Sequence, residues 1–354
     1  MATVLQSDLY VQSDLTGGRD SRGVLSLILA AASRVGDDLI RKVNIWSDRG
    51  SKSDFAVATQ IAEKFCLRFM DRSEDSRTPV RMTAAEAYEK WKSLCLGVYG
   101  PIYFPQTRPV PTAVFFGGAG GEGHRRFYPN IAPNRFIKEQ RYFLRSSAHY
   151  RKLKRDILED LAFLGQGAEG SVDPMMLHYR HFRDRCHGGR APQHGNLLSP
   201  LSSAVLRRAS SLCSPEQIER SQVLADILIN AHCELASMPY DSAGKTFDAR
   251  HYSEAIDAVE AVRSASTTGR IFAADAASLE PGDFTKASVL RMLRDEFLTQ
   301  YEHMRGTGFF PKGYLEGARR TAEEAALNGR FAHARSGCPI SHIILAGELS
   351  RLQN

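Results

Sequence analysis

Residues 15–22, with the sequence LTGGRDSR, combine hydroxyl, glycine and carboxylate groups in a pattern suited to binding phosphate. The stretch at residues 9–15 predicts a short strand before this loop, and the apolar run at residues 23–33 predicts a buried helix after it. Backbone N–H groups of such a loop and the positive end of the helix converge on phosphate oxygens. Gly17 and Gly18 allow close approach because they carry no Cβ.

The polar side chains of the loop have complementary roles. Thr16 and Ser21 can donate hydroxyl hydrogen bonds, and Asp20 can hold the Mg²⁺ that bridges the phosphates. We therefore predict that phosphate is bound by Thr16, Gly17, Gly18, Arg19 and Ser21, with Asp20 as metal ligand. The similarity of this loop to that of the ATP pyrophosphatases implies that the nucleotide is ATP and that Asp20 is also a catalytic residue. A glycine turn that only caps a helix is the alternative.

A second glycine loop follows a second predicted strand. The strand covers residues 112–116 and runs directly into GGAGGEG at residues 117–123. This loop also satisfies the G-x-G-x-x-G pattern of dinucleotide-binding folds. No apolar helix follows it, and no strand ending in an acidic residue appears about 20 residues later, which argues against a dinucleotide site.

The first loop resembles the S-G-G-x-D-S loop of the ATP pyrophosphatases, with Thr16 in place of the first serine, and the longer pattern is similar to the asparagine synthetase-like branch. In that family a second loop rich in glycine and acid grips the pyrophosphate. The resemblance implies that Gly118, Gly120 and Gly121 contact the nucleotide and that Glu122 is a second metal ligand opposite Asp20. A solvated loop carboxylate is the alternative for Glu122.

One departure from the family falls inside the second loop. Asparagine synthetases carry a glutamate where this chain has Ala119, so the acid–base work of that glutamate is missing here. The resemblance continues through residues 178–185, 198–201 and 235–247. It implies that Lys245 contacts the phosphates as a catalytic residue, because a cation stabilises a developing pyrophosphate. The alternative is a surface lysine.

The order of elements predicts an α/β fold with a parallel sheet. Strands at residues 42–46 and 66–70 flank a helix at residues 54–65, and strand–helix alternation places a ligand at the carboxyl ends of the strands. The resemblance implies a sheet of the adenine nucleotide α-hydrolase (HUP) type. We expect a nucleotide-binding α/β domain at residues 1–131 and a mainly helical domain at residues 132–354 that completes the active site.

Helical patterns account for most of the chain beyond residue 131, where strand signals fade. One helical pattern precedes that point, at residues 84–95, and the others cover residues 135–164, 173–186, 201–212, 215–237, 249–264, 286–304 and 313–328. The stretches at residues 165–171 and 188–196 are expected to be flexible connections.

Composition fits an ordinary folded protein. The 354 residues are 43% hydrophobic and 24% charged, with a net charge of +6 that suits nucleotides as well as nucleic acid. The six cysteines form no C-x-x-C pair, no apolar stretch reaches membrane-spanning length, and no export signal is recognised. We expect a cytoplasmic protein with reduced thiols and no membrane partner.

Two clusters invite other readings. The basic stretch at residues 135–155 could contact nucleic acid, but a solvated helix face is favoured. Four histidines, His178, His181, His187 and His194, lie near Cys186, yet their spacing fits no standard zinc site and the neighbouring arginines would repel a cation. Arg180, Arg183 and Arg185 are expected to be anion partners.

The resemblance implies a reaction in which a carboxylate attacks the α-phosphorus of ATP, pyrophosphate leaves with Mg²⁺, and an amine captures the acyl-adenylate as an amide. Asparagine synthetases carry a glutaminase domain whose catalytic cysteine follows the first methionine, but here Ala2 stands there. We therefore expect small-molecule or peptide carboxylate and amine substrates. A tRNA-modifying pyrophosphatase and a catalytically impaired nucleotide-binding protein stay open as alternatives.

Overall fold

The computed structural model describes residues 1–70, 80–97, 101–128, 131–139, 141, 146–166, 173–184, 195–257 and 280–352. Its centre is a five-stranded sheet with the order β3-β2-β1-β4-β5, and every neighbouring pair is parallel. The strands are β1 (Tyr10–Asp14), β2 (Val43–Trp46), β3 (Arg68–Phe69), β4 (Ala113–Phe116) and β5 (Asn196–Leu198). The parallel α/β sheet expected from the sequence is confirmed.

Strand order reverses at β1, which lies between β2 and β4. From β1 the chain passes outward to β2 and β3, and it then returns to the other side of β1 for β4 and β5. In open parallel sheets a ligand binds at such a reversal, outside the carboxyl ends of the two adjoining strands. Both glycine loops begin at this edge, one directly after β1 and the other directly after β4.

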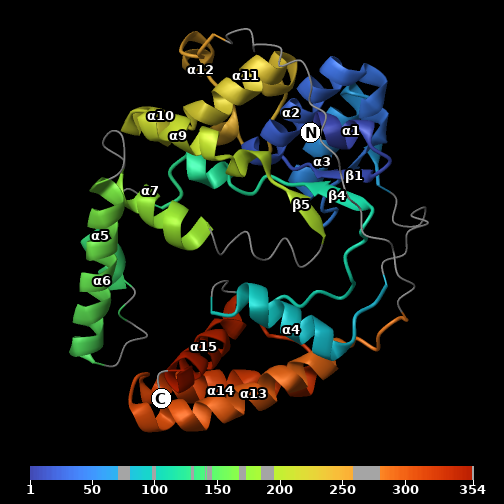
Figure 1. Ribbon diagram of the computed structural model, residues 1–354. Coiled ribbons are helices and arrows are strands. Elements are labelled where there is room, and N and C mark those ends of the chain that lie inside the picture. The colour runs from blue at the N-terminus through green and yellow to red at the C-terminus, as the bar shows by residue number, and fades with distance from the viewer. Residues whose placement is uncertain are drawn as a thin grey trace.

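One face of the sheet carries the main hydrophobic core. Successive side chains of a strand point to opposite faces of the sheet. Val11, Ile45 and Phe116 all belong to one buried core, which also contains side chains from the surrounding helices. The helices around the sheet are α1 (Ala2–Gln6), α2 (Arg19–Val35), α3 (Lys52–Lys64) and α11 (Gln222–Ser237). Among them α2 and α11 pack closely against each other (Figure 1). The helix α2, which begins at the first glycine loop, is thereby fixed from both sides.

A second core lies among four helices. These are α4 (Ala84–Cys95), α13 (Lys286–Thr307), α14 (Lys312–Asn328) and α15 (Cys338–Leu352), which lie together in Figure 1. Trp91 of α4 and Phe297 of α13 are almost fully buried there. The division into domains at residue 131 stays a prediction. Each core contains side chains from before and after this residue: α4 packs with α13 in the second core, and Leu201 and α11 pack with the sheet in the first.

Six more helices are described outside these two groups. They are α5 (Pro133–Glu139), α6 (Ser147–Gln166), α7 (Pro174–His178), α9 (Ala204–Leu212), α10 (Pro215–Arg220) and α12 (Ala249–Ser253). Short 3-10 turns are η1 (Asp37–Lys42), η2 (Gly121–His124), η6 (Pro200–Ser202), η7 (Ala243–Lys245) and η8 (Ala334–Gly337), and a π turn covers Tyr179–Arg183.

Three expectations beyond residue 131 were wrong. The strand β5 was missed, because three residues without apolar alternation give no strand signal, and the open edge of β4 supplies its backbone partners. The predicted helix at residues 215–237 is broken at Ser221, whose φ of 66° is left-handed. The predicted helix at residues 249–264 ends at Ser253 within the part that is described. The C-terminal helix α15 was not anticipated.

Candidate functional site

The first glycine loop is held in shape by its own hydroxyl groups. The Ser21 Oγ accepts from the Thr16 N–H at 3.0 Å and lies 3.0 Å from the Thr16 Oγ1. The Thr16 Oγ1 in turn accepts from the Gly18 N–H at 3.2 Å. Because the same groups are the predicted phosphate donors, a nucleotide would exchange these short internal hydrogen bonds for bonds to phosphate oxygens.

Gly17 lies in close contact with two aspartates that the sequence argument did not single out. Its N–H donates to the Asp54 Oδ1 at 2.8 Å, and a Cβ at this position would lie 2.3 Å from the Cβ of Asp241. Asp54 is itself fixed by the Ser51 hydroxyl at 2.7 Å. A side chain at residue 17 would therefore displace the segment that carries Lys245, which is the local reason for glycine here.

The second loop packs directly against the first. A Cβ at Gly121 would lie 2.4 Å from the Asp20 Oδ1, and a Cβ at Gly118 would lie 3.1 Å from the Asp20 Cβ. Gly120 has a φ of 91°, and a Cβ there would lie 2.3 Å from the Ser202 Oγ. Gly118 and Gly121 therefore lie against Asp20, although the two loops are about a hundred residues apart in sequence.

Asp20 and Glu122 are close enough for their charges to interact, and their assignment as metal ligands stays a prediction. One oxygen of each carboxylate, the Asp20 Oδ1 and the Glu122 Oε2, is buried without a hydrogen-bond partner. Burial, and then the charge of Asp20, raise the pKa of Glu122. Two buried carboxylate oxygens without donors suit a hard divalent cation. Among the described residues no group of three or more histidine, cysteine or carboxylate side chains is arranged to hold a metal, so phosphates and water would supply the other ligands.

The structure brings Lys245 to the first loop through its neighbours. The Asp241 N–H donates to the Gly17 carbonyl at 3.3 Å, and the Lys245 Nζ lies 2.6 Å from the Asp241 Oδ2. The Arg19 Nε donates to the Lys245 carbonyl at 2.8 Å. Lys245 is thus beside the predicted phosphate site, with its amine held by Asp241. The Arg19 guanidinium is occupied by backbone carbonyls, including that of Lys245. The predicted contact between Arg19 and the nucleotide therefore depends on the backbone N–H of Arg19.

Arg22, in the first turn of α2, is completely buried. Its guanidinium donates to the carbonyls of Met238 at 2.8 Å and Pro239 at 2.5 Å, and it lies 3.6 Å from the centroid of the Tyr240 ring. Burial lowers the pKa of Arg22, and the side chains of Tyr240 and then Asp241 oppose that effect. Arg22 therefore ties the loop helix to the segment that leads to Lys245.

The second loop is supported from behind by a buried histidine. His124 is fully buried, and its Nε2–H donates to the Leu201 carbonyl at 2.6 Å while its Nδ1 lies 3.1 Å from the Ser210 Oγ. Burial lowers the pKa of His124. The Ser202 Oγ also donates to the Ala119 carbonyl at 3.1 Å. The loop backbone is thereby fixed to the segment at residues 198–202.

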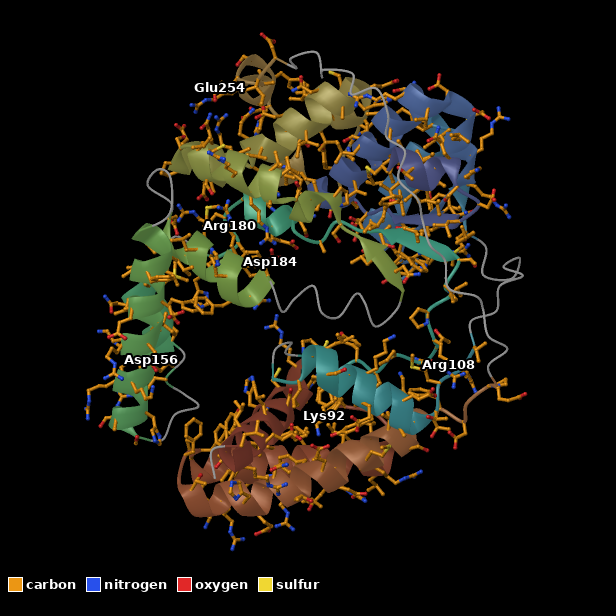
Figure 2. The ribbon with its side chains drawn as sticks, in the orientation of Figure 1. Lys92, Arg108, Asp156, Arg180, Asp184 and Glu254 are labelled. Atoms are coloured by element: carbon orange, nitrogen blue, oxygen red, sulfur yellow. The ribbon has the colours of Figure 1, made fainter. Side chains whose placement is uncertain are left out.

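The arginines after α7 serve the protein itself. The Arg180 Nε donates to the Gly123 carbonyl at 2.9 Å, and Asp184, close by in Figure 2, accepts from Arg207 at 2.7 Å. The guanidinium of Arg183 lies 4.7 Å from the Phe127 ring centroid. Arg180 is therefore a partner of the second loop. Arg185, Cys186, His187 and His194 lie outside the described residues, and His178 packs among Tyr128, Phe136 and Phe182.

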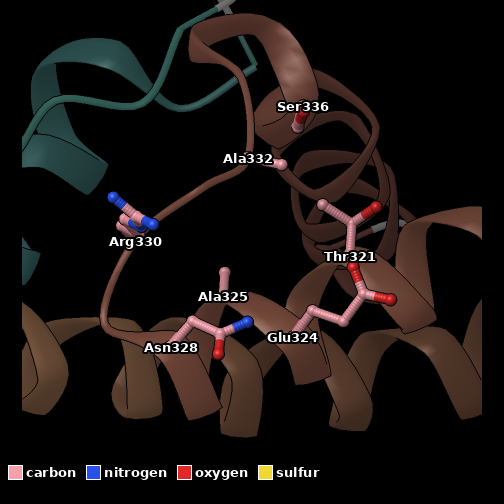
Figure 3. A pocket seen from close by; sticks show the side chains of 7 residues that line it. All are labelled: Thr321, Glu324, Ala325, Asn328, Arg330, Ala332 and Ser336. Carbon is pink, nitrogen blue, oxygen red and sulfur yellow. The ribbon is translucent and has the colours of Figure 1, made fainter.

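A hollow of about 320 Å³ opens beside the carboxyl ends of β2 and β3. Its lining residues are Ile45, Trp46, Ser47, Asp48, Arg49, Phe55, Phe69 and Met70. Three of these residues, Trp46, Phe55 and Phe69, are aromatic, so the hollow can take a flat group. A larger hollow of about 640 Å³ lies at the end of α14 and draws none of its lining from the glycine loops (Figure 3).

Asp14, the last residue of β1, is a carboxylate of this edge that the sequence argument missed. A Cβ at Gly117 would lie 3.9 Å from the Asp14 Oδ2, so Asp14 borders the start of the second loop. Burial raises the pKa of Asp14 to about 6, and a hydrogen bond with Gln12 opposes that effect. A charged residue at the end of a buried strand, just before a glycine loop, was the signal that could have identified it.

The raised pKa of Asp14 predicts a pH-dependent cost in stability. The folded protein binds the Asp14 proton more tightly than the unfolded chain does, so stability falls as pH rises from about 4 to about 6. Asp14→Asn should therefore raise the free energy of unfolding by at most about 3 kcal/mol at pH 7.5 and hardly change it at pH 3.5. Urea denaturation at both pH values measures this, with the exposed Asp38→Asn as control. An equal gain at both pH values would contradict the prediction.

The contact between the second loop and Asp20 predicts the effect of a single added methyl group. Gly121→Ala would place its Cβ against the Asp20 carboxylate and push that group out of position, so ATP binding should weaken about tenfold or more. Gly244→Ala is the matched control, because a Cβ there meets no atom within 4 Å. Isothermal titration with Mg²⁺ and a non-hydrolysable ATP analogue measures both variants. Equal affinities would show that the loops do not meet around Asp20.

The basic stretch of α5 and α6 is largely solvent-exposed. Lys152 pairs with Asp156 at 2.6 Å and Arg135 with Glu139 at 3.4 Å, both one helical turn apart. Such pairs are typical of a solvated helix face. In the described part of the chain, no helix combines the length and the apolar character that crossing a membrane requires.

The candidate site therefore comprises two glycine loops, a carboxylate pair, a nearby lysine and an aromatic hollow, all at one edge of a parallel sheet. Comparisons of the chain with family models, with curated proteins and with solved structures found no match.

Proposed function

We propose that this protein is an ATP-dependent carbon–nitrogen ligase that adenylates a carboxylate, releases pyrophosphate and transfers the acyl group to an amine. The observation that carries the proposal is the meeting of Asp20 and Glu122, each with a buried unpartnered oxygen, where two glycine loops leave adjacent parallel strands. The strand order and the resemblance of the loops to asparagine synthetase-like enzymes favour a sheet of the HUP type. Loop and sheet thus support the same reaction class.

Different residues would bind the phosphates, the adenine and the Mg²⁺ of the nucleotide. The N–H groups of Thr16, Gly18 and Arg19 and the hydroxyls of Thr16 and Ser21 would hold phosphate oxygens at the start of α2. The aromatic hollow beside β2 and β3 would take the adenine. Asp20 and Glu122 would hold Mg²⁺, which when bound neutralises charge on the departing pyrophosphate. Lys245 would add a second positive charge after leaving Asp241.

Capture of the acyl-adenylate requires a group that accepts a proton from the amine. Ala119 removes the glutamate that the related enzymes use, and Asp14 offers a carboxylate at the same edge of the sheet. With a pKa of about 6, Asp14 is mostly deprotonated at neutral pH and can accept that proton. Asp14→Asn protein should then release pyrophosphate but form amide more slowly. Equal amide rates would remove Asp14 from the mechanism.

Pyrophosphate release from ATP and Mg²⁺ tests the proposed function directly. The protein is assayed with pooled amino acids, with tRNA and with neither, and Asp20→Asn protein serves as the control for contaminating activity. Release with amino acids supports the ligase. Release that needs tRNA identifies a tRNA-modifying enzyme instead, and ATP binding without release identifies a nucleotide-binding protein without turnover.

A further inference from the structure

Arg125 lies in the proposed metal and phosphate site, where it pairs with Asp20. It follows the turn η2, which also carries Glu122, so one short segment positions both side chains. The Arg125 Nη2 lies 3.1 Å from the Asp20 Oδ2, and the two side chains are 32% and 21% exposed. Arg125 is therefore a partly buried cation paired with the carboxylate that the proposed function assigns to Mg²⁺.

The charges at the site explain why a cation is needed there without nucleotide. Asp20 and Glu122 each bury a carboxylate oxygen that accepts no hydrogen bond, and two like charges in this position repel each other. The guanidinium of Arg125 lies 3.1 Å from the other oxygen of Asp20. Arg125 thus neutralises part of the negative charge that would otherwise destabilise the empty loops.

A guanidinium and a divalent cation compete for the same carboxylate. The described residues offer this site two carboxylates and no third protein ligand group, and Mg²⁺ is commonly bound by one or two carboxylates together with substrate phosphates. A metal ion at the Asp20 Oδ1 without nucleotide would meet the positive charge of Arg125 on the Oδ2 of the same carboxylate, and the two cations would repel each other. A triphosphate changes this balance, because its oxygens give the guanidinium a new anionic partner.

We propose that Arg125 is a triphosphate-binding residue that holds Asp20 in the nucleotide-free protein, so that metal and nucleotide bind together. This inference rests on the proposed function, because it requires that Asp20 and Glu122 hold the metal of a bound nucleotide. It assigns a role to a residue that the loop motifs do not include. The coupling is reciprocal, so nucleotide should favour metal binding by the same factor as metal favours nucleotide binding.

The neighbouring arginine provides a matched control. Arg126 is a residue of the same type in the same segment, but it pairs with Asp173 at 3.3 Å and with Glu219 at 2.6 Å, away from Asp20. Arg126→Gln therefore removes an equal charge from the loop without releasing Asp20. Arg125→Lys keeps a charge near Asp20 and serves as a second variant should Arg125→Gln fail to fold.

The test is a Mn²⁺ titration of the full chain followed by electron paramagnetic resonance, with and without α,β-methylene-ATP. Without nucleotide, Arg125→Gln protein should bind Mn²⁺ about tenfold more tightly than wild type, and Arg126→Gln should match wild type. Adding the analogue should tighten Mn²⁺ binding about tenfold in wild type and in Arg126→Gln, but much less in Arg125→Gln. Arg125→Lys should resemble wild type.

The outcomes separate this inference from the proposed function. If wild type binds Mn²⁺ with the analogue while Arg125→Gln shows the same affinities and the same coupling, the role of Arg125 is wrong and the ligase proposal stands. If wild type binds neither Mn²⁺ nor the analogue, both fail. Arg126→Gln protein that behaves like Arg125→Gln would show a general charge effect and would overturn the assignment to Arg125.

Discussion

Asp20→Asn should abolish Mg²⁺-dependent pyrophosphate formation, with a loss of about a thousandfold or more. Asparagine keeps an oxygen that can accept from the Arg125 guanidinium, so the local contact at 3.1 Å can survive. The amide cannot supply the negative charge that a divalent cation requires, and its N–H₂ group would face the position of the unpartnered Oδ1. Mg²⁺-nucleotide binding and the rate of pyrophosphate formation should both fall, because the Asp20 carboxylate would bind the metal ion that neutralises the leaving pyrophosphate.

Pyrophosphate release under saturating ATP measures this effect, and circular dichroism with thermal unfolding tests whether the fold is retained. Asp38→Asn, an exposed change beyond the other end of α2, is the matched control and should keep full activity. Glu122→Gln should produce a smaller but parallel loss, since Asp20 remains. Unchanged pyrophosphate release by a folded Asp20→Asn protein would refute the metal assignment.

Arg22→Met should produce the largest loss of stability among single changes in the loop region, about 3 kcal/mol or more. The guanidinium is fully buried and donates to the backbone carbonyls of Leu235, Met238 and Pro239. Methionine fills much of the same volume but leaves these carbonyls without donors, and the cation–π contact with Tyr240 is lost. Lysine cannot replace the planar fork of donors, so Arg22→Lys should also destabilise.

Urea denaturation followed by circular dichroism gives the free energy of unfolding for these variants. Arg34→Met is the matched control, because Arg34 lies in the last turn of the same helix and is exposed, so its change should be within about 0.5 kcal/mol. Nucleotide binding at low temperature should weaken in Arg22→Met protein as well, since Arg22 holds the segment that leads to Lys245. A wild-type free energy of unfolding in Arg22→Met protein would show that these contacts contribute little.

Apolar patterns in the sequence predicted the strands and helices that bury a continuous apolar face. The apolar runs around the first glycine loop gave β1 and α2 within a few residues, and α4 was predicted with its observed bounds, Ala84–Cys95. Alternation of strands and helices predicted the parallel sheet. In each case burial of a continuous apolar face specifies the element, and that face is visible in the sequence.

Other features depend on contacts that no local pattern contains. The strand β5 exists because the edge of β4 offers hydrogen bonds, and its three residues carry no signal of their own. The Gly17 partner Asp54 lies 37 residues away, and Asp241 belongs to a different part of the chain. Motif reasoning identified Asp20, Glu122 and the glycines because a phosphate-binding loop needs those types. Arg125 and Asp14 were not singled out, because their proposed roles rest on tertiary contacts with Asp20 and with the second loop that no local motif contains.

The hydrogen bond from the Arg19 Nε to the Lys245 carbonyl joins residues that are 226 positions apart in the chain. A growing polypeptide can form β1, its loop and α2 early, yet those elements lack their anchors until residues 235–247 have been synthesised and have folded back. Nucleotide affinity should consequently arise late during translation, after most of the chain has emerged. Stalled nascent chains that end before residue 235 would carry the complete first loop and still fail to retain ATP.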